Sequence, residues 1–166
     1  MSLQIRIQAD DFFKAYHALE KNSNSDTMAV MGPGIVCLSF SVELYLKDLH
    51  FALTGKAPRG HDVYKLFETL PAETRQEIFT HKSISKNPFM TRGNMFSIQY
   101  HSRAYSAYER FIDQMKTISD GFEKWRYSYE SCTLKYDSYF AIALIEAIKS
   151  TADSIRQQPF KKRASE

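Results

Sequence analysis

The fold is decided by residues 38–55, which read LSFSVELYLKDLHFALTG. Apolar residues recur there at spacings of three and four, which is the period of one face of an α-helix. Gly32 and Pro33 precede the stretch, and proline suits the first turn of a helix. Gly55 follows it, at a position where glycine commonly ends a helix. We therefore predict a helix over residues 32–54, with an apolar face formed by Leu38, Val42, Tyr45, Leu46, Leu49 and Leu53.

The same helical period recurs along most of the chain, and few segments favour strands. It is clearest over residues 108–129, where apolar residues share one face and charged residues the other. Shorter apolar stripes predict helices over about residues 12–19, 62–70, 71–82 and 134–155. Residues 83–94 contain Pro88 and Gly93 and are predicted to form a loop or a disordered excursion. The expected fold class is all-α, an up-and-down bundle of five to six helices.

Length and composition fit one ordinary soluble domain. Of the 166 residues, 43% are hydrophobic and 25% are charged, which is typical of a globular protein. The net charge of +3 excludes a protein that binds nucleic acid by bulk positive charge alone. We assign residues 1–156 to a single helical-bundle domain and residues 157–166 to a basic C-terminal tail that we expect to be disordered.

Sequence signals for compartment are simple. Cys37 and Cys132 are far apart and belong to no paired motif, which indicates free thiols in a reducing environment. The first residues carry no secretory pattern, and no apolar run reaches the length of a membrane span. We therefore predict a cytoplasmic protein that does not contact a membrane.

Motifs for metals, cofactors and phosphate cradles are missing. The five histidines never fall four residues apart from one another, and there is no paired cysteine motif. Gly32, Pro33 and Gly34 precede a helix, but no Gly-Lys-Ser/Thr follows them. We interpret them as the turn that starts the helix, and we predict neither a metal site nor a cofactor.

A polar line runs along the predicted helix 32–54, opposite its apolar face. Glu43 and Lys47 lie four residues apart in the orientation that favours an ion pair, and the line continues through Ser39, His50 and Thr54. One interpretation is a solvated helix face with a modest salt bridge. The other is a partly buried pair that faces a partner helix or a ligand. Periodicity alone favours the solvated face.

Residues 59–62 read RGHD and close the loop before the predicted helix 62–70. Asp62 is a good N-cap residue, because its carboxylate accepts hydrogen bonds from the exposed N–H groups of a first turn. A catalytic His61 needs a positioned partner, and the sequence offers none nearby. We therefore favour a capping role for this segment over a catalytic one.

Residues 125–130 read WRYSYE. Arg126 can form an ion pair with Glu130, four residues further on. The rival interpretation is that Arg126 and Tyr127 bind phosphate and stack on bases. Residues 99–136 hold six basic and five acidic residues, which is a weak electrostatic signature for nucleic acid.

Three blocks of the sequence resemble the HEPN superfamily of small helical bundles. They are residues 43–47 (ELYLK), residues 54–63 (TGKAPRGHDV) and residues 122–130 (FEKWRYSYE). The resemblance covers about residues 28–150. It implies a bundle that dimerises, and many such proteins bind or cleave RNA in toxin–antitoxin and phage-defence systems. We expect a polar network that joins helices or binds a ligand, formed by Glu43, Lys47, His61, Asp62, Arg126, Tyr127 and Glu130.

The ribonuclease members of that superfamily resemble one another in an Arg-x4–6-His motif near the start of the last bundle helix. Here the matching spacing is Arg75 to His81, in the predicted helix 71–82 instead. Six helical residues span about 600°, so the two side chains point about 120° apart on an unbroken helix. Position and geometry both disfavour catalysis.

The leading hypothesis is a dimeric, non-catalytic binding or accessory module whose ligand is RNA or a nucleotide. A partner protein encoded nearby is compatible with it. One alternative is a metal-independent endoribonuclease that uses Arg75 and His81, and the other is a pure protein-interaction domain.

Overall fold

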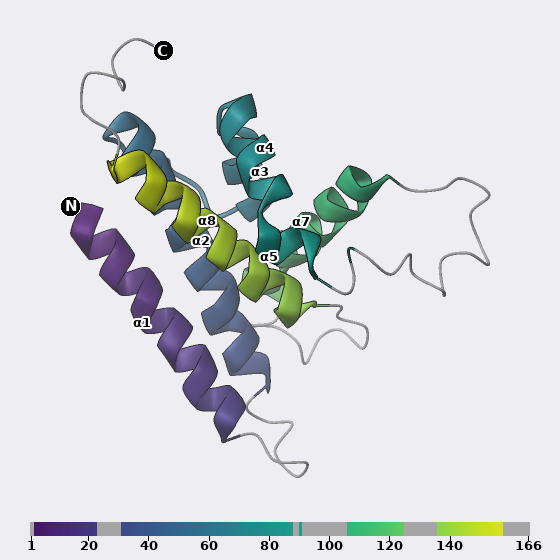
Figure 1. Ribbon diagram of the computed structural model, residues 1–166. Helices are drawn as coiled ribbons and strands as arrows, with labels where there is room; N and C mark the ends of the chain where they lie inside the picture. Colours follow the sequence, from purple (N-terminus) through teal and green to yellow (C-terminus); the bar gives the residue numbers. More distant parts are fainter. Residues whose placement is uncertain (1, 23–30, 88–89, 91–105, 125–135, 158–166) are drawn as a thin grey trace.

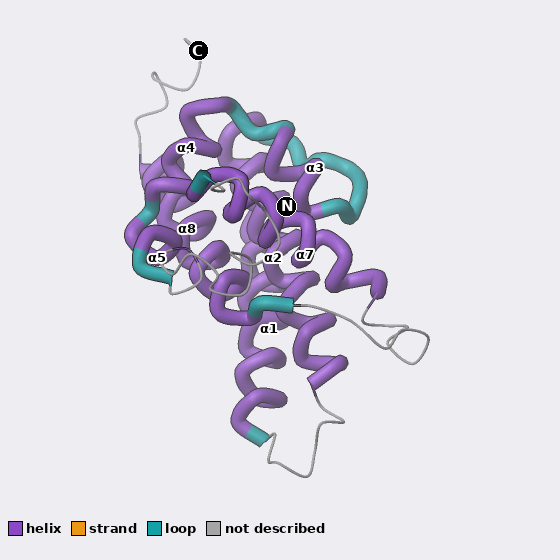
Figure 2. Tube along the Cα trace, turned by 90° about the vertical axis from the view of Figure 1, so that its right-hand side faces the viewer, coloured by secondary structure: helices purple, strands orange, loops and turns teal. Residues whose placement is uncertain are grey.

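The computed structural model describes residues 2–22, 31–87, 90, 106–124 and 136–157 (Figure 1). These ranges contain helices and short connecting loops but no strand (Figure 2), which confirms the all-α fold class. The helices are α1 (Ser2–Lys21), α2 (Met31–Thr54), α3 (Val63–Glu68), α4 (Ala72–Thr80), α5 (Lys82–Ser85), α7 (Ala107–Lys124) and α8 (Ser138–Gln157).

Helix α2 lies at the centre of the fold and packs against α1, α3, α7 and α8. In Figure 1, α1 and α2 form an antiparallel hairpin, and α8 runs beside α2 in the same direction. The short helices α4 and α5 pack on α8, while α3 packs on α7. Because α2 has neighbours on several sides, it must be buried around most of its circumference.

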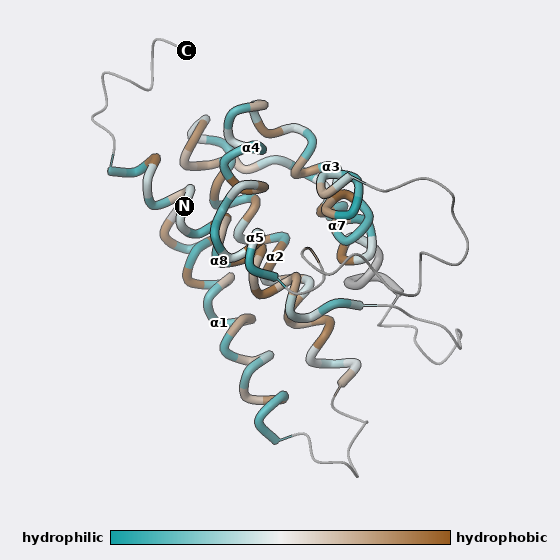
Figure 3. The backbone as a smooth tube through the Cα atoms, turned by 45° about the vertical axis from the view of Figure 1, so that its right-hand side comes forward, coloured by the Kyte–Doolittle hydropathy of each residue, from teal (hydrophilic) through white to brown (hydrophobic). Residues whose placement is uncertain are grey.

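The predicted face of α2 forms the middle of the core. Leu38, Val42, Tyr45, Leu46 and Leu49 are fully buried, as the spacing of three and four predicts. Hydrophilic and hydrophobic residues alternate along helix α1 (Figure 3). Its partly buried Phe12 contacts Phe40 of α2 edge-on. A second part of the core, made of Phe67, Phe111 and Phe140, joins α3, α7 and α8.

Several predicted boundaries are confirmed. Helix α2 ends at Thr54, and Gly55 adopts a φ of 72°, which glycine reaches without steric cost. Asp62 caps α3, because its side chain accepts a hydrogen bond from the backbone N–H of Lys65. The predicted last helix is present as α8, but it begins at Ser138 instead of residue 134. Asp137 caps this start, because its carboxylate accepts a hydrogen bond from the N–H of Phe140.

Two further predictions were wrong in detail. The chain turns at His81 and forms α5 over residues 82–85, part of the segment predicted to be a loop. The imidazole of His81 accepts from the N–H of Ser83 and so caps this single turn. The described residues also contain seven helices instead of five to six, because the four-residue α5 is too short to show a periodic apolar face.

Candidate functional site

The centre of the candidate site is the carboxylate of Glu43 on α2. Its Oε1 accepts hydrogen bonds from Lys47 Nζ at 2.7 Å and from His61 Nδ1 at 3.0 Å. Only 1% of the Glu43 side chain is exposed, whereas 71% of the His61 side chain is exposed. The structure therefore brings together three residues of the predicted network, with the acid buried and the histidine at the surface.

The interpretation of this polar line as a solvated helix face was wrong. Besides Glu43, the side chains of Ser39 and His50 are buried. Ser39 donates a hydrogen bond to the phenol oxygen of Tyr136, and His50 Nε2 lies 2.9 Å from the carbonyl oxygen of Leu66. The reason is the central position of α2, since α3 and α7 pack on it as well as α1 and α8. The partial burial that the second interpretation predicts for the Glu43–Lys47 pair is confirmed.

The second oxygen of Glu43 is unusual. Its Oε2 is buried and has no hydrogen-bond partner among the described residues. A buried acceptor without a donor costs about 1–3 kcal/mol, so the site holds an acceptor that a further donor group would stabilise.

Asp62 fixes the start of α3 against α7. Its Oδ1 accepts from the Lys65 N–H at 3.0 Å and from the Ser119 hydroxyl at 2.7 Å, and Ser119 Oγ in turn accepts from the N–H of Tyr64 at 2.8 Å. Partial burial raises the pKa of Asp62, but the hydrogen bonds from Ser119 and Lys65 outweigh it and hold the pKa below its ordinary value. Asp62 therefore acts as a structural anchor.

The loop between α2 and α3, residues 55–62, is termed here the basic loop. It exposes Lys56, Arg59 and His61. Glycines with positive φ stand near its two ends, Gly55 at 72° and Gly60 at 98°. His61 and Asp62 attach its C-terminal end to α2 and α7. Neither Lys56 nor Arg59 has an ion-pair partner within the described residues.

Arg75 and His81 are not brought into contact. Helix α4 ends at Thr80, and His81 leaves the helical conformation with φ −58° and ψ 144°. Its Nδ1 faces Ser83, with the hydroxyl oxygen at 2.7 Å. No hydrogen bond joins Arg75 to His81 in the described part of the chain, and the Nε of Arg75 is buried without a partner there. Their catalytic role stays a prediction.

The remaining predicted site residues, Arg126, Tyr127 and Glu130, lie outside the described residues. Within the described residues no group of three or more His, Cys, Asp or Glu side chains is arranged to hold a metal ion. Cys37 is a free thiol. No helix in the described ranges combines the length and apolarity that a membrane crossing requires.

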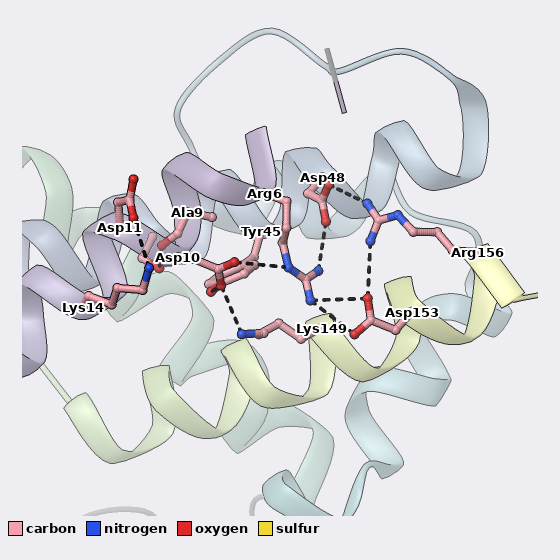
Figure 4. A network of polar contacts seen from close by, with 11 residues as sticks. Arg6, Ala9, Asp10, Asp11, Lys14, Tyr45, Asp48, Lys149, Asp153 and Arg156 are labelled. Carbon is pink, nitrogen blue, oxygen red and sulfur yellow. Dashed lines mark hydrogen bonds and ion pairs between the residues drawn. The ribbon is translucent and has the colours of Figure 1, made fainter. Parts of the chain in front are cut away.

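Sequence reasoning missed a second polar group, the ionic cluster shown in Figure 4. Asp48 of α2 is fully buried and binds Arg6 of α1 and Arg156 of α8. Both arginines also contact Asp153, and Asp10 accepts from Tyr45 and Lys149. We name this set, Arg6, Asp10, Tyr45, Asp48, Lys149, Asp153 and Arg156, the three-helix ionic cluster.

The three-helix ionic cluster connects α1 to α8 across α2. Burial raises the pKa of Tyr45, and its hydrogen bond to Asp10 raises it further, so the phenol stays protonated. Burial also raises the pKa of Asp10, but hydrogen bonds from Tyr45 and Lys149 outweigh that effect and lower it overall. Each charged group forms an ion pair with an opposite charge. We therefore interpret the cluster as a structural connection between the three helices.

The fold and site therefore define a small all-helical protein with a buried, shared carboxylate beneath a basic loop. Comparison of the chain with family models, with curated proteins and with solved structures finds no match.

Proposed function

We propose that this protein is a HEPN-like binding module whose ligand carries phosphate, either RNA or a nucleotide. The observation that carries the proposal is the pair of exposed cations, Lys56 and Arg59, on the basic loop. Neither is neutralised by an acidic side chain among the described residues. Unpaired lysine and arginine side chains are the groups that bind phosphate in nucleic-acid complexes.

The attachment of the basic loop supports the same proposal. His61 bonds to the buried Glu43, and Asp62 bonds to Ser119 of α7. Binding costs less when the binding groups are already ordered. A loop held to two long helices presents its cations with less loss of conformational freedom than an unattached loop does.

Dimer formation belongs to the proposal. Leu3 and Ile7 lie one helical turn apart on α1, and they are 70% and 50% exposed. Adjacent exposed aliphatic side chains favour contact with another apolar surface. A second copy of α1 offers one by symmetry. Light scattering of the purified protein, and of a Leu3→Gln/Ile7→Gln variant, tests this part: the wild type is expected to be a dimer and the variant a monomer.

The binding proposal is tested with a fluorescent oligouridylate of about twelve nucleotides, measured by anisotropy in the presence of a chelator. The wild type should bind it, with an affinity that falls as salt rises. The Lys56→Ala/Arg59→Ala variant should bind less tightly, and its salt slope should decrease by about 0.7 for each phosphate that the variant no longer neutralises. The matched control is Lys14→Ala/Lys21→Ala on α1, which removes two exposed cations away from the loop and should change little.

Three outcomes contradict the proposal. Absence of RNA and nucleotide binding at low salt, together with salt-independent binding of a partner protein, indicates the protein-interaction domain. RNA cleavage that persists with chelator and disappears in His81→Ala indicates the endoribonuclease. Equal losses of affinity in the loop variant and its control mean that the basic loop is not the binding surface.

A further inference from the structure

A second surface, separate from the buried Glu43, combines aromatic rings with cations. It is formed by Tyr64 of α3, Arg75 of α4, and Tyr108 and Lys116 of α7, and we name it the aromatic surface. Helices α3 and α7 pack side by side (Figure 1), and Phe79 of α4 contacts Tyr108. Helix α7 therefore meets α3 at the Lys116–Tyr64 contact and α4 at the Tyr108–Phe79 contact.

Tyr108 is an exposed ring that two aromatic contacts hold in place. Its ring is nearly parallel to that of Phe111, with an interplanar angle of 19° and a centroid distance of 6.3 Å. Phe79 packs edge-on at 5.2 Å and prevents the ring from swinging away. The residue is nonetheless 39% exposed. A large, ordered and exposed ring is the kind of platform on which a nucleic-acid base stacks.

Tyr64 is the second ring of the surface and is also held in place. Its N–H donates to Ser119, and its hydroxyl donates to Glu68. The ammonium of Lys116 lies 5.2 Å from the ring centroid, within the range of a cation–π contact. The Tyr64 ring therefore lies next to the exposed ammonium of Lys116, which forms no ion pair with an acidic side chain among the described residues.

Arg75 adds a guanidinium with unused donors. It has no ion pair in the described part of the chain, and its Nε is buried without an acceptor. Arg75 lies one helical turn before Phe79 on the same side of α4, and Phe79 packs against the ring of Tyr108. A planar guanidinium beside tyrosine rings is suited to bind phosphate or to stack on a base.

We infer that the aromatic surface stacks the unpaired bases of single-stranded RNA, while Arg75 and Lys116 bind the adjoining phosphates. An apolar peptide would leave both cations without partners, whereas a nucleic-acid strand supplies a π-face and a negative charge at every step. Tyr64 lies two residues after the end of the basic loop, so one strand can pass from the loop to the rings. This inference rests on the proposed function and adds that the protein binds the bases of the RNA as well as its phosphates.

The experiment compares two probes of about twelve units, oligouridylate and an abasic ribose-phosphate strand of equal length. The wild type should bind the oligouridylate more tightly, by about 5- to 150-fold for each stacked base. The Tyr64→Leu/Tyr108→Leu variant should bind both probes with the affinity that the wild type has for the abasic strand. Tyr139→Leu is the matched control, because Tyr139 is an exposed tyrosine on α8, and it should bind as the wild type does.

The Tyr→Leu variant is checked by its circular dichroism melt. If it does not fold, Tyr64→Phe/Tyr108→Phe keeps the rings, and ultraviolet crosslinking of the wild type to oligouridylate locates the contacts directly. Crosslinks at Tyr64 or Tyr108 support the inference, and crosslinks confined to other regions overturn it.

Failure of the inference is distinct from failure of the proposed function. Equal affinity of the wild type for both probes overturns base stacking but leaves phosphate binding by the basic loop intact. Absence of binding to either probe overturns both. Tighter binding of oligothymidylate than of oligouridylate overturns the assignment to RNA in favour of single-stranded DNA.

Discussion

The carboxylate of Asp48 on α2 is completely buried, and Nη1 of Arg6 on α1 lies 3.0 Å from its Oδ2. Arg156 of α8 binds the other oxygen of the same carboxylate. One buried negative charge therefore holds the first and last helices of the described chain onto the central one. Helices α1 and α8 are separated by most of the sequence. The contact therefore stabilises the packing of the helices against one another, and it does not stabilise any single helix.

Replacing Asp48 with asparagine should destabilise the protein strongly. Removing one partner of a buried ion pair leaves the opposite charge without compensation, which costs about 3–5 kcal/mol. The side chains of Arg6 and Arg156 are 16% and 31% exposed, so we expect the lower end, about 3 kcal/mol. Urea denaturation of wild type and Asp48→Asn measures the difference in the free energy of unfolding.

Asp153→Asn is the matched control for Asp48→Asn. Asp153 contacts the same two arginines but is 51% exposed, and exposed ion pairs contribute about 0–1 kcal/mol. If Asp153→Asn is as damaging as Asp48→Asn, burial of the Asp48 charge is not what gives the pair its strength.

Asp10 should make stability depend on acid pH. Burial raises its pKa, but the hydrogen bonds from Tyr45 and Lys149 lower it overall, below the ordinary 3.8. A depressed pKa in the folded state contributes stability above the unfolded pKa, and this stability is lost as pH falls through the folded value. The difference in melting temperature between wild type and Asp10→Asn should be constant above about pH 5 and shrink below about pH 4. Asp11→Asn changes an exposed neighbour whose ion-pair partner among the described residues is Lys14 alone, and it should show a smaller difference. An equal acid-dependent difference would exclude Asp10 as the source.

Glu43→Gln should destabilise the fold and uncouple Lys47. Glu43 is buried and Lys47 is 15% exposed, so the variant leaves a mostly buried ammonium without its counter-charge. We expect a loss of about 2–3 kcal/mol, in line with other severed, hydrogen-bonded charges. A double-mutant cycle with Lys47→Met, measured by urea denaturation, should give a coupling energy above about 1 kcal/mol.

His61 provides the comparison for the Glu43–Lys47 coupling. It contacts the same Glu43 oxygen but is 71% exposed, so the coupling of Glu43→Gln with His61→Ala should stay within about 1 kcal/mol. A larger coupling to His61 than to Lys47 would mean that the surface contact, and not the buried one, holds the carboxylate.

The parts of the fold that local physics controls could be predicted from the sequence. The apolar face of α2 follows from the spacing of Leu38, Leu46 and Leu49, and the α3 cap follows from the carboxylate of Asp62, because both depend on near neighbours in the chain. The burial of Asp48 and Glu43 could not be predicted in the same way. Their partners or covering helices come from distant segments, and periodicity does not say which polar face is covered. The only local signal is that α2 has few charges for its length.

Two of the three glycines that have open space around an added Cβ form a last, paired prediction. An added Cβ meets no atom within 4 Å at Gly60 or at Gly32, so packing is equal at the two positions and only the backbone differs. Gly60 has a φ of +98°, where a side chain costs about 1–2 kcal/mol. Gly32 lies in the first turn of α2 without a positive φ, where alanine is favoured over glycine by up to about 1 kcal/mol.

Gly60→Ala should therefore lower the melting temperature, and Gly32→Ala should leave it unchanged or raise it. Because the strain at Gly60 falls on the basic loop between Arg59 and His61, Gly60→Ala should also weaken oligouridylate binding more than its loss of stability explains. The core contacts of α2 do not involve this loop, so the helical circular dichroism signal should be retained. Unchanged RNA affinity in a variant with a lowered melting temperature would show that the conformation of the basic loop does not control binding.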